Sequence, residues 1–471
     1  MKLFGDNIMR FENDIIYHLR EIIRIRSIRS MPAEGMPYGR DISEALRYML
    51  DLGRKLGFET KNIDGYAGHA EYGEGEKVIG VLVHLDVVPE GSGWTHPPYE
   101  GRVTGGRIYG RGAADNKGPA VVALYSLKTL KDSGILPDRR VRVIFGTNEE
   151  NGMDDMAHYF SKEPCPVMAF SPDAGYPIFN REKGIMRLRI TSPKHSLASV
   201  RYINGGIAAN VVPDFCEAQI AACEMTAAEL FILNRLAEKQ QTGCIINIKC
   251  ESENIIITAR GKQAHASDPA TGLNAISSLI AFIFSAGIIS GEDTLLRFIN
   301  DKINLETNGS LLGIACNDDE SGELTLNLGM IAADVTGGTA DLDIRYPVTF
   351  SGKQLLDRIY EQLDTCGLVL ADFYDSPPLF MNENHPLIRI LSSAYEKVTS
   401  KKAGLLSLSG GTYARMLRNR CVAFGSADGC NVHQPDEFVT ISGLMGHARI
   451  CTQALYELAV ADLNDTGDVC L

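Results

Sequence analysis

The sequence predicts an α/β domain that is split in the chain by an inserted α+β domain. Two short, continuously apolar runs at 78–83 and 141–146 are typical of strands buried on both faces of a mostly parallel sheet. Stretches with helical spacing of apolar residues alternate with these runs, as in doubly wound folds. After Lys183 the strand candidates instead alternate polar and apolar residues, which is typical of strands with one solvated face.

The first 183 residues supply most of the predicted α/β domain. The expected elements are helices at 11–27, 41–56 and 120–132 and strands at 78–83 and 141–146. Pro119 stands just inside the start of the third helix, a position that proline favours. The acidic segment Glu149–Asp155 follows the second strand, and we expect it to begin a further helix.

The inserted domain and the return to the α/β domain follow from the same patterns. In the insertion we expect strands at MRLRITS, NIIITARG and ADLDIRYPV, with helices at about 271–286 and 352–366 covering one face. After it we expect strands at Ala403–Ser407 and Cys421–Ala423 and a helix at 446–462. The predicted domains are therefore 1–183 with 382–471, and 184–381.

The composition of the chain restricts the classes of binding partner and the cellular compartment that we expect. The 471 residues are 45% hydrophobic and carry a net charge of −13, which disfavours nucleic acid and anionic membranes as partners. We find no run of about 20 apolar residues that would span a membrane. The eleven cysteines form no C-x-x-C motif, and the amino-terminal segment lacks the apolar core of a signal peptide. Free, buried thiols in a reducing cytoplasm are the simplest expectation.

Two segments place candidate chemistry at the ends of strands. His84 and Asp86 end the first buried strand, and residues i and i+2 of an extended chain point the same way, so the carboxylate can orient the imidazole. A plain surface His–Asp pair is the alternative. Glu149 and Glu150 are adjacent after the second strand, so one can bind a metal while the other takes a proton from water. They could equally be favourable partners of a helix dipole.

Three further segments are weak evidence for a functional site when each is considered alone. Asp115 in YGRGAADNKGP lies among small residues that allow close approach, although it could simply cap the next helix. Asp173 in FSPDAGYP could be an ordinary turn residue, and His433 in NVHQPDE could face solvent. Apart from Asp86, the five segments supply two histidines and four carboxylates, which is enough for two divalent ions that share one carboxylate, with one glutamate left as a base.

The ordered motifs resemble those of the M20 family of co-catalytic metallopeptidases. The resemblance spans about residues 10–460 and rests on HLDVVPEG, GRGAADNKGP, GTNEENG, FSPDAGYPIFNREKG, GKQAHASDPATGLNA and the late His433. The long insertion and FSPDAGYPIFNREKG are similar to the dipeptidase V, or Xaa-His dipeptidase, branch. Asn116 and Asn148 depart from the family pattern, which usually has Asp at both positions.

The resemblance implies a site for two divalent ions, with zinc expected and manganese or cobalt as alternatives. The implied metal ligands are His84, Asp115, Glu150, Asp173 and His433. Asp115 would bridge the two ions, Asp86 would orient His84, and Glu149 would be the general base. The implied reaction is hydrolysis of an unblocked dipeptide by a water that the two metals share. An N-acyl amino acid amidohydrolase and a non-catalytic peptide-binding homologue are the alternatives.

Other residues are candidates for substrate contact. By resemblance, His265 would stabilise the oxyanion, although it could be a loop histidine that caps a strand. Arg345 could pair with the substrate α-carboxylate, or it could be a solvated charge on a strand, and Asn210 is a weaker candidate. The backbone N–H groups of the loop at Gly410, Gly411 and Thr412 could hold that same carboxylate, or the loop could be a tight turn without a ligand. His265 and Arg345 would act only if the insertion closes as a lid, so we expect hinges near 184 and 381 and, from the insertion's length, a self-sufficient monomer.

Overall fold

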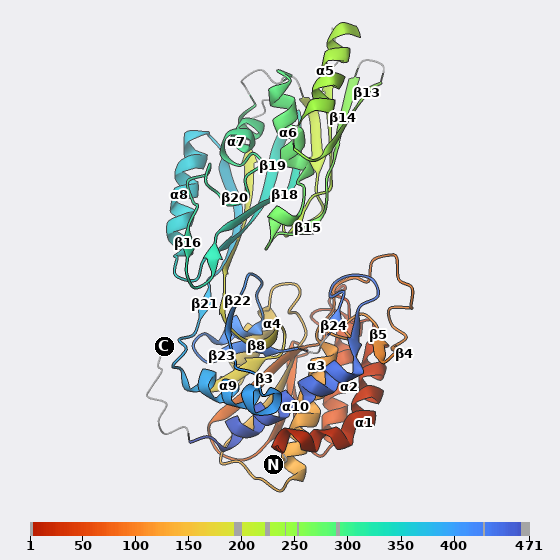
Figure 1. The fold of residues 1–471 in the computed structure, drawn as a ribbon, viewed down its shortest axis with the longest axis vertical. Coiled ribbons are helices and arrows are strands. Elements are labelled where there is room, and N and C mark those ends of the chain that lie inside the picture. The colour runs from red at the N-terminus through yellow and green to blue at the C-terminus, as the bar shows by residue number, and fades with distance from the viewer. Residues whose placement is uncertain are drawn as a thin grey trace. The chain divides into compact units, whose positions relative to one another are not determined.

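The computed structural model describes residues 3–192, 200–221, 227–240, 242–251, 254–288, 293–426 and 429–462. Two compact units make up the chain, one of Met1–Arg181 with Leu379–Leu471 and one of Glu182–Pro378 (Figure 1). We call them unit 1 and unit 2. The divisions fall at 181/182 and 378/379, a few residues from those that the sequence pattern suggested.

The sheet of unit 1 is parallel at its centre and antiparallel at both sides. Its strand order is β1-β2-β6-β3-β7-β23-β8-β21, with β22 paired to β8. The parallel centre consists of β6 (Arg140–Gly146), β3 (Val78–His84), β7 (Met168–Ser171) and β23 (Cys421–Gly425). The flanking strands are β1 (Glu59–Ile63), β2 (Ala67–Tyr72), β8 (Gly175–Glu182), β21 (Leu379–Phe380) and β22 (Leu405–Leu408). The predicted α/β fold class is confirmed.

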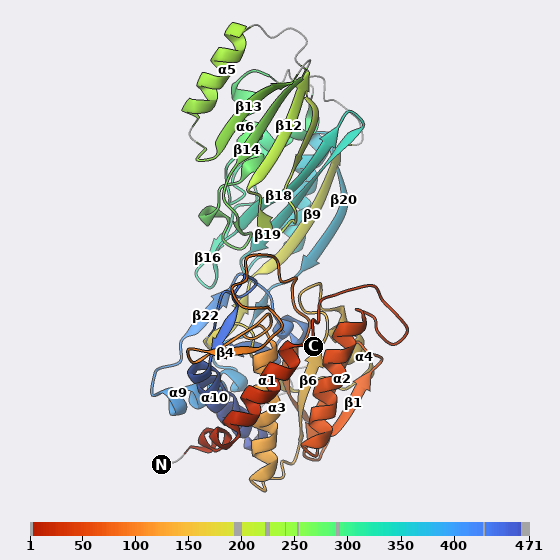
Figure 2. The ribbon, with the colours of Figure 1, turned by 90° about the vertical axis from the view of Figure 1, so that its right-hand side faces the viewer.

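Helices cover both faces of this sheet. Ile79, Val81 and Val83 of β3 pack against the larger helices in one hydrophobic core. Leu82 belongs to a second core on the opposite face of the sheet. The first side carries η1 (Phe4–Phe11), α1 (Glu12–Ile23), α2 (Arg40–Lys55), α3 (Lys117–Asp132), α9 (Pro386–Thr399) and α10 (Ile441–Val460) (Figure 2). The second side carries α4 (Asp154–Lys162) and η3 (Tyr413–Leu417). The buried strands expected from continuous apolar runs therefore lie between two helical layers.

Unit 2 is built on an antiparallel sheet with strand order β13-β14-β12-β10-β18-β19-β9-β20. Its strands are β9 (Gly184–Ser192), β10 (Val200–Gly205), β12 (Phe215–Ala221), β13 (Ile245–Glu251), β14 (Asn254–Arg260), β18 (Thr325–Asp334), β19 (Gly337–Tyr346) and β20 (Val369–Ser376). Its helices are α5 (Ala227–Lys239), α6 (Ala275–Ser285), α7 (Thr294–Lys302) and α8 (Gly352–Thr365). The α+β character predicted for the insertion is confirmed, with α6 and α8 at the predicted helical stretches.

The alternating pattern of the unit 2 strands has a direct structural counterpart. Leu188 and Ile190 of β9 pack into the core, whereas Arg189 between them forms an ion pair with Asp341 of β19, at 2.8 Å between Nε and Oδ1. One face of the sheet is thus apolar, and the other carries charged cross-strand pairs.

Shorter pieces complete the fold. A four-stranded antiparallel sheet contains β4 (Arg102–Thr104), β5 (Arg107–Tyr109), β24 (Gly429–Cys430) and β25 (Phe438–Thr440). Two-stranded ribbons pair β11 (Val211–Val212) with β15 (Ala264–His265) and β16 (Asn317–Asp318) with β17 (Gly322–Glu323), and η2 spans Pro269–Thr271. Within the described ranges, no helix has the length and apolar character needed to cross a membrane.

The cysteines whose side chains the structure describes are free, as expected, but not all of them are buried. Cys216, Cys244, Cys421 and Cys451 are free and buried, but Cys250 is free and exposed. Cys223 and Cys470 lie outside the described residues.

We expect Leu124→Ala to lower the free energy of unfolding of the chain by about 2–5 kcal/mol, because Leu124 of α3 is fully buried and truncation leaves a cavity. The matched control is Leu136→Ala, since the Leu136 side chain is 60% exposed and loses little packing. Urea unfolding followed by circular dichroism measures both. Equal effects of the two substitutions would contradict the assignment of α3 to the core.

Candidate active site

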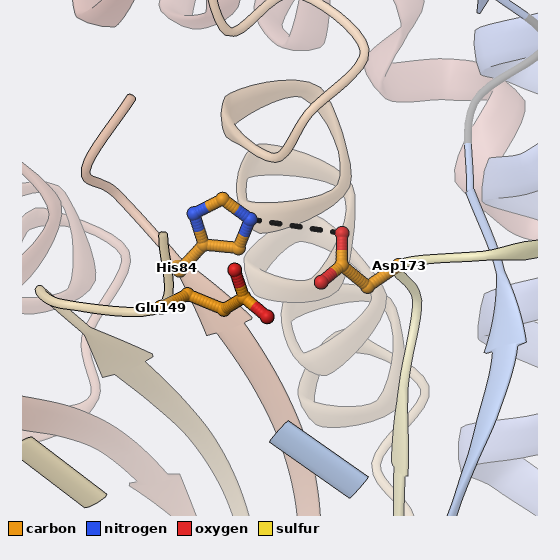
Figure 3. Close-up of side chains that lie close together, drawn as sticks. All are labelled: His84, Glu149 and Asp173. Carbon is orange, nitrogen blue, oxygen red and sulfur yellow. Dashed lines mark ion pairs between the residues drawn. The ribbon is translucent and has the colours of Figure 1, made fainter. Parts of the chain in front are cut away.

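The candidate site lies at the carboxyl-terminal edge of the parallel strands of unit 1. His84 is the last residue of β3, and Asp173 lies in the segment after β7. Glu149 and Glu150 lie in the turn after β6. Neighbouring parallel strands end at the same edge of a sheet, which is where open α/β sheets place their ligands. Figure 3 shows the side chains of His84, Glu149 and Asp173 converging from three separate segments.

The His84 imidazole is buried, and both of its ring nitrogens face acceptors. Its Nε2 lies 2.8 Å from Oδ1 of Asp115 and 3.6 Å from Oδ1 of Asp173. Its Nδ1 lies 3.0 Å from the main-chain oxygen of Asp86 and 3.5 Å from that residue's carboxylate. Residue 86 therefore approaches the ring with its carbonyl more closely than with its side chain.

The Asp115 carboxylate lies between two histidines. Its Oδ1 faces Nε2 of His84 at 2.8 Å, and its Oδ2 faces Nε2 of His433 at 3.0 Å. The same nitrogen of His433 lies 3.0 Å from Oε1 of Glu150. Each oxygen of one carboxylate thus serves a different imidazole, and Asp115 joins the His84 side of the site to the His433 side.

Asp86 fixes the turn that carries the two glutamates. Its carboxylate accepts hydrogen bonds from the backbone N–H of Glu149 and of Glu150, both at 3.1 Å. The prediction that a helix begins in the segment Glu149–Asp155 is correct only at its end, because α4 begins at Asp154. The acidic pair belongs to a turn, because Met153, the residue before α4, has a positive φ of 64° that a helix cannot contain.

Burial and mutual repulsion dominate the electrostatics of the acidic residues. Burial, together with the nearby Asp173 carboxylate, raises the pKa of Glu149 well above its ordinary value. Burial and Asp115 raise the pKa of Glu150 to about 7, and burial raises the pKa of Asp173 to about 6. Several carboxylates therefore lie close together at one edge of the sheet. Their burial and mutual repulsion cost free energy, and a bound cation would reduce that cost.

The pKa shifts of the two histidines and of Asp115 favour their charged forms, unlike those of Glu149, Glu150 and Asp173. Burial alone would lower the pKa of His84, but Asp173, Asp115 and Asp86 outweigh it and raise that pKa well above its ordinary value. Burial opposes charge on His433 too, yet Asp115 and Glu150 raise its pKa to about 11. Burial would raise the pKa of Asp115, but hydrogen bonds from His433 and His84 hold it far below its ordinary value.

A buried Asp–Tyr pair lies behind the site and carries no signal in the sequence. The Tyr413 hydroxyl donates to Oδ2 of Asp155, which also accepts from the backbone N–H of Thr147 at 2.7 Å and of Asn148 at 3.0 Å. The Tyr413 ring packs edge-on against the His84 ring, with centroids 6.2 Å apart. Tyr413 follows the glycine loop directly and was identifiable only as its neighbour.

The two departures from the family pattern have structural roles beside the site. The Asn116 amide donates to Oδ1 of Asp173 and to the carbonyl of Pro172, both at 2.8 Å. An ionised aspartate could not make these donations, so Asn116 orients Asp173 in a way that Asp would not. The Asn148 amide donates to Asp154, which ties the glutamate turn to the start of α4.

The unit 2 candidates gather at one end of that unit's sheet. His265 pairs with Val211 in the β11–β15 ribbon, and the backbone N–H of Ala266 donates to the carbonyl of Asn210 at 3.0 Å. The His265 side chain is exposed, with Nδ1 2.7 Å from the Ser267 hydroxyl. His265 and Asn210 are therefore brought together.

Arg345 differs from the solvated strand charge that its sequence alone suggests. Its guanidinium is buried and donates from Nη2 to Oδ2 of Asp343 at 3.0 Å. Thr325, which pairs with Arg345 across β18 and β19, places its hydroxyl 3.5 Å from the carbonyl of Ala266. Arg345 thus lies near the His265 ribbon, held by an aspartate.

The glycine loop at 410–412 leads into η3. The Thr412 hydroxyl accepts a hydrogen bond from the backbone N–H of Ala414 at 3.1 Å and caps this short helix. Nη2 of Arg415 donates to the carbonyl of Gly410 at 3.3 Å. Residues of η3 therefore hold the loop in place. The loop precedes Tyr413, whose ring packs on His84.

The donor set of unit 1 fits divalent metal ions. Two groups of side chains have ligand atoms that all lie within 4.8 Å of one another, namely His84 with Glu149 and Asp173, and His84 with Asp115 and Glu150. Imidazole nitrogen and carboxylate oxygen are the ligands that zinc and similar ions take in proteins. The geometry also places Glu149, predicted as a base, among the atoms that could reach an ion.

Comparison with known proteins supports this chemistry. The profile of "Peptidase family M20/M25/M40" matches residues 80–457. A Bacillus subtilis (strain 168) protein named "Putative dipeptidase YtjP" is 38% identical over 466 residues, covering 96% of this chain and 98% of that protein.

Two solved structures share the fold at low sequence identity. An M20 family metallo-carboxypeptidase from Sulfolobus solfataricus gives a TM-score of 0.59 at 17% identity, covering 95% of this chain and 99% of the other. Human carnosine dipeptidase 1 also gives a TM-score of 0.59, at 14% identity, covering 97% and 98%.

We expect zinc to stabilise the chelator-treated chain by about 3 kcal/mol at a free ion concentration of 100 times its Kd, because only the folded state brings the ligands together. Chemical unfolding with and without zinc measures the gain. Asp115→Asn should lose most of it, whereas Asp138→Asn, at an exposed carboxylate, should keep it. An equal gain in Asp115→Asn and the unaltered chain would show that zinc binds elsewhere.

Proposed function

Because the chain belongs to peptidase family M20/M25/M40, we propose that it is a metal-dependent dipeptidase that hydrolyses the peptide bond of unblocked dipeptides. The single observation that carries the proposal is the Asp115 carboxylate, which presents one oxygen to His84 and the other to His433. A carboxylate in that position is suited to bridging two ions. The name of the Bacillus subtilis relative supports the choice of a dipeptide as substrate.

We assign two ions to the site. One would be held by His84 and Asp173 and the other by Glu150 and His433, with Asp115 between them; zinc is the first choice, and manganese and cobalt are alternatives. Two such ions would supply the Lewis acidity that activates a water and polarises the substrate carbonyl. Asn116 would keep Asp173 oriented through the hydrogen bond to its Oδ1.

Glu149 is the proposed general base. Its backbone N–H is bound by Asp86, and its carboxylate lies close to His84 and Asp173. Burial raises the pKa of Glu149, so its ionised carboxylate is a stronger proton acceptor than a free one and can hold the proton before it passes to the leaving amine. Asp86 would therefore position both the base and, through its contacts to Nδ1, His84.

Unit 2 would supply the remaining contacts to the substrate. His265 would donate a hydrogen bond to the oxyanion, with Asn210 beside it. Arg345, oriented by Asp343, would pair with the substrate α-carboxylate, which the N–H groups of Gly410, Gly411 and Thr412 would also face. These roles require unit 2 to act as a lid, with hinges at the two connections between the units.

We further propose that the enzyme works as a monomer in the cytoplasm. The length of the insertion, Glu182–Pro378, supports a chain that supplies its own His265 to the site. The free cysteines among the described residues suit a reducing compartment.

We expect Glu149→Gln to lower kcat for dipeptides by about 10²- to 10⁴-fold, because it removes the proton acceptor. The matched control, Glu76→Gln on an exposed loop, should keep full activity. The measurement is release of free amino acids from a dipeptide panel by protein loaded separately with zinc, manganese and cobalt, with N-acetyl amino acids run alongside.

The panel decides between the proposal and its alternatives. Preference for N-acetyl amino acids over free dipeptides would replace the dipeptidase by an amidohydrolase. Peptide binding without turnover under all three metals would indicate a binding protein. Full activity of Glu149→Gln would contradict its role as the base.

We expect His265→Ala to lower kcat by about 10²-fold or more while metal binding stays unchanged, because the ring would stabilise only the transition state. Gln263→Ala is the matched control, since Gln263 is exposed two positions away in the same segment. Steady-state kinetics and calorimetric metal titration separate the two effects. A kcat of His265→Ala equal to that of the control would remove His265 from the mechanism.

A further inference from the structure

The loop that carries His433 adopts a backbone conformation that requires support. Asn431, His433 and Asp436 all have positive φ values, of 60°, 63° and 57°. Side-chain-bearing residues rarely hold this conformation unless surrounding contacts impose it. The loop is held partly by its own hydrogen bonds, such as that from Nδ2 of Asn431 to the carbonyl of Pro435 at 3.3 Å, and partly by contacts with other segments.

Glu437, at the end of this loop, links it directly to Asp115. Its Oε1 accepts hydrogen bonds from the backbone N–H of Ala114 at 3.1 Å and of Asp115 at 3.3 Å. Its Oε2 accepts from Nη1 of Arg111 at 2.7 Å. The Glu437 side chain is fully buried and that of Arg111 is 1% exposed, so the ion pair is shielded from water.

Arg111 extends the connection to a third segment. Its Nη1 lies 3.3 Å from the carbonyl of Gln434, next to His433 in the chain. Its Nη2 contacts the carbonyls of Pro89 and Glu90, at 3.3 and 3.4 Å, in the segment that follows His84 and Asp86. The guanidinium also lies over the Trp94 ring, 5.3 Å from its centroid.

We infer that the Arg111–Glu437 ion pair is a positioning device that sets the separation of Asp115 and His433, and so sets the affinity for the ion that they share with Glu150. This inference rests on the two-ion site proposed above. Both residues act through others: Glu437 fixes the backbone of Asp115, and Arg111 fixes the loop of His433. Neither would touch an ion or the substrate.

Stability alone is a weak reason for such a pair. Removing two charges from water is costly, and apolar side chains of similar volume often stabilise a core as well or better. What an apolar pair could not do is accept from the Asp115 N–H and donate to the Gln434 carbonyl. Residues that orient metal ligands typically change metal affinity by about 10- to 100-fold when they are replaced.

The chain offers a matched control in another buried ion pair. Arg142 and Glu163 lie 2.9 Å apart in unit 1, with side chains 3% and 6% exposed. Their surroundings are β1, whose Lys61 also pairs with Glu163, together with β2, β6 and α4, and among the contacts that the structure describes for them none is to a candidate ligand. Glu163→Gln therefore removes an equivalent charge without disturbing the His433 loop.

The test is calorimetric titration of the whole, chelator-treated chain with zinc alone. We expect two ions to bind the unaltered protein and Glu163→Gln with the same affinities. In Glu437→Gln the ion beside Glu150 and His433 should bind about 10- to 100-fold more weakly, and the other ion, which Asp115 would also contact, should weaken less. Arg111→Lys, which keeps a charge but loses the forked geometry, should weaken the same ion less. Circular dichroism confirms folding before each titration.

Several results would overturn the inference while leaving the dipeptidase proposal intact. One is a folded Glu437→Gln or Arg111→Lys that binds both ions as the unaltered chain does. Another is an equal weakening of both ions, or the same weakening in Glu163→Gln, since either would show a general loss of stability. Uptake of fewer than two ions by the unaltered chain would instead contradict the two-ion site itself.

Discussion

The rest of the site depends on one carboxylate, that of Asp115, which faces a histidine with each of its oxygens. Around it the fold concentrates further acidic groups at a buried edge, where burial and repulsion raise the pKa values of Glu149, Glu150 and Asp173. Such a concentration of charge is unfavourable for the metal-free chain. It is tolerated because the two histidines, and any cations bound there, offset it.

Hydrogen bonds from backbone N–H groups also stabilise buried carboxylates around the site. Asp86 holds the turn of Glu149 and Glu150, Asp155 holds the turn at Thr147, and Glu437 holds the segment before Asp115. In each case a buried carboxylate is satisfied by the main chain of a neighbouring loop. The acidic residues that would touch ions are therefore placed by other acidic residues that would not.

The sequence predicts the parts of this arrangement that follow from local rules. Continuous apolar runs identified β3 and β6, and polar residues directly after them identified His84, Asp86 and the glutamate pair, because parallel strands end at one edge. Family membership, expected from the ordered motifs, is confirmed by the match over residues 80–457.

The parts that the sequence does not reveal depend on contacts between distant segments. The turn of Glu149 and Glu150 is held by Asp86, 63 positions before Glu149, and the sequence does not mark this contact. The pairing of Arg111 with Glu437 spans 326 positions, and nothing in either motif marks it as buried. The burial of Arg345 depends likewise on Asp343 and on strand pairing, which its own residue type does not indicate.

The most direct test of the central claim is a diffraction experiment on crystals of the unaltered chain soaked with zinc, with data collected at the zinc absorption edge. We expect two adjacent anomalous peaks, one beside His84 and Asp173 and one beside Glu150 and His433, with Asp115 contacting both. A single peak, or two peaks that do not share Asp115, would contradict the bridging role on which the proposed chemistry rests.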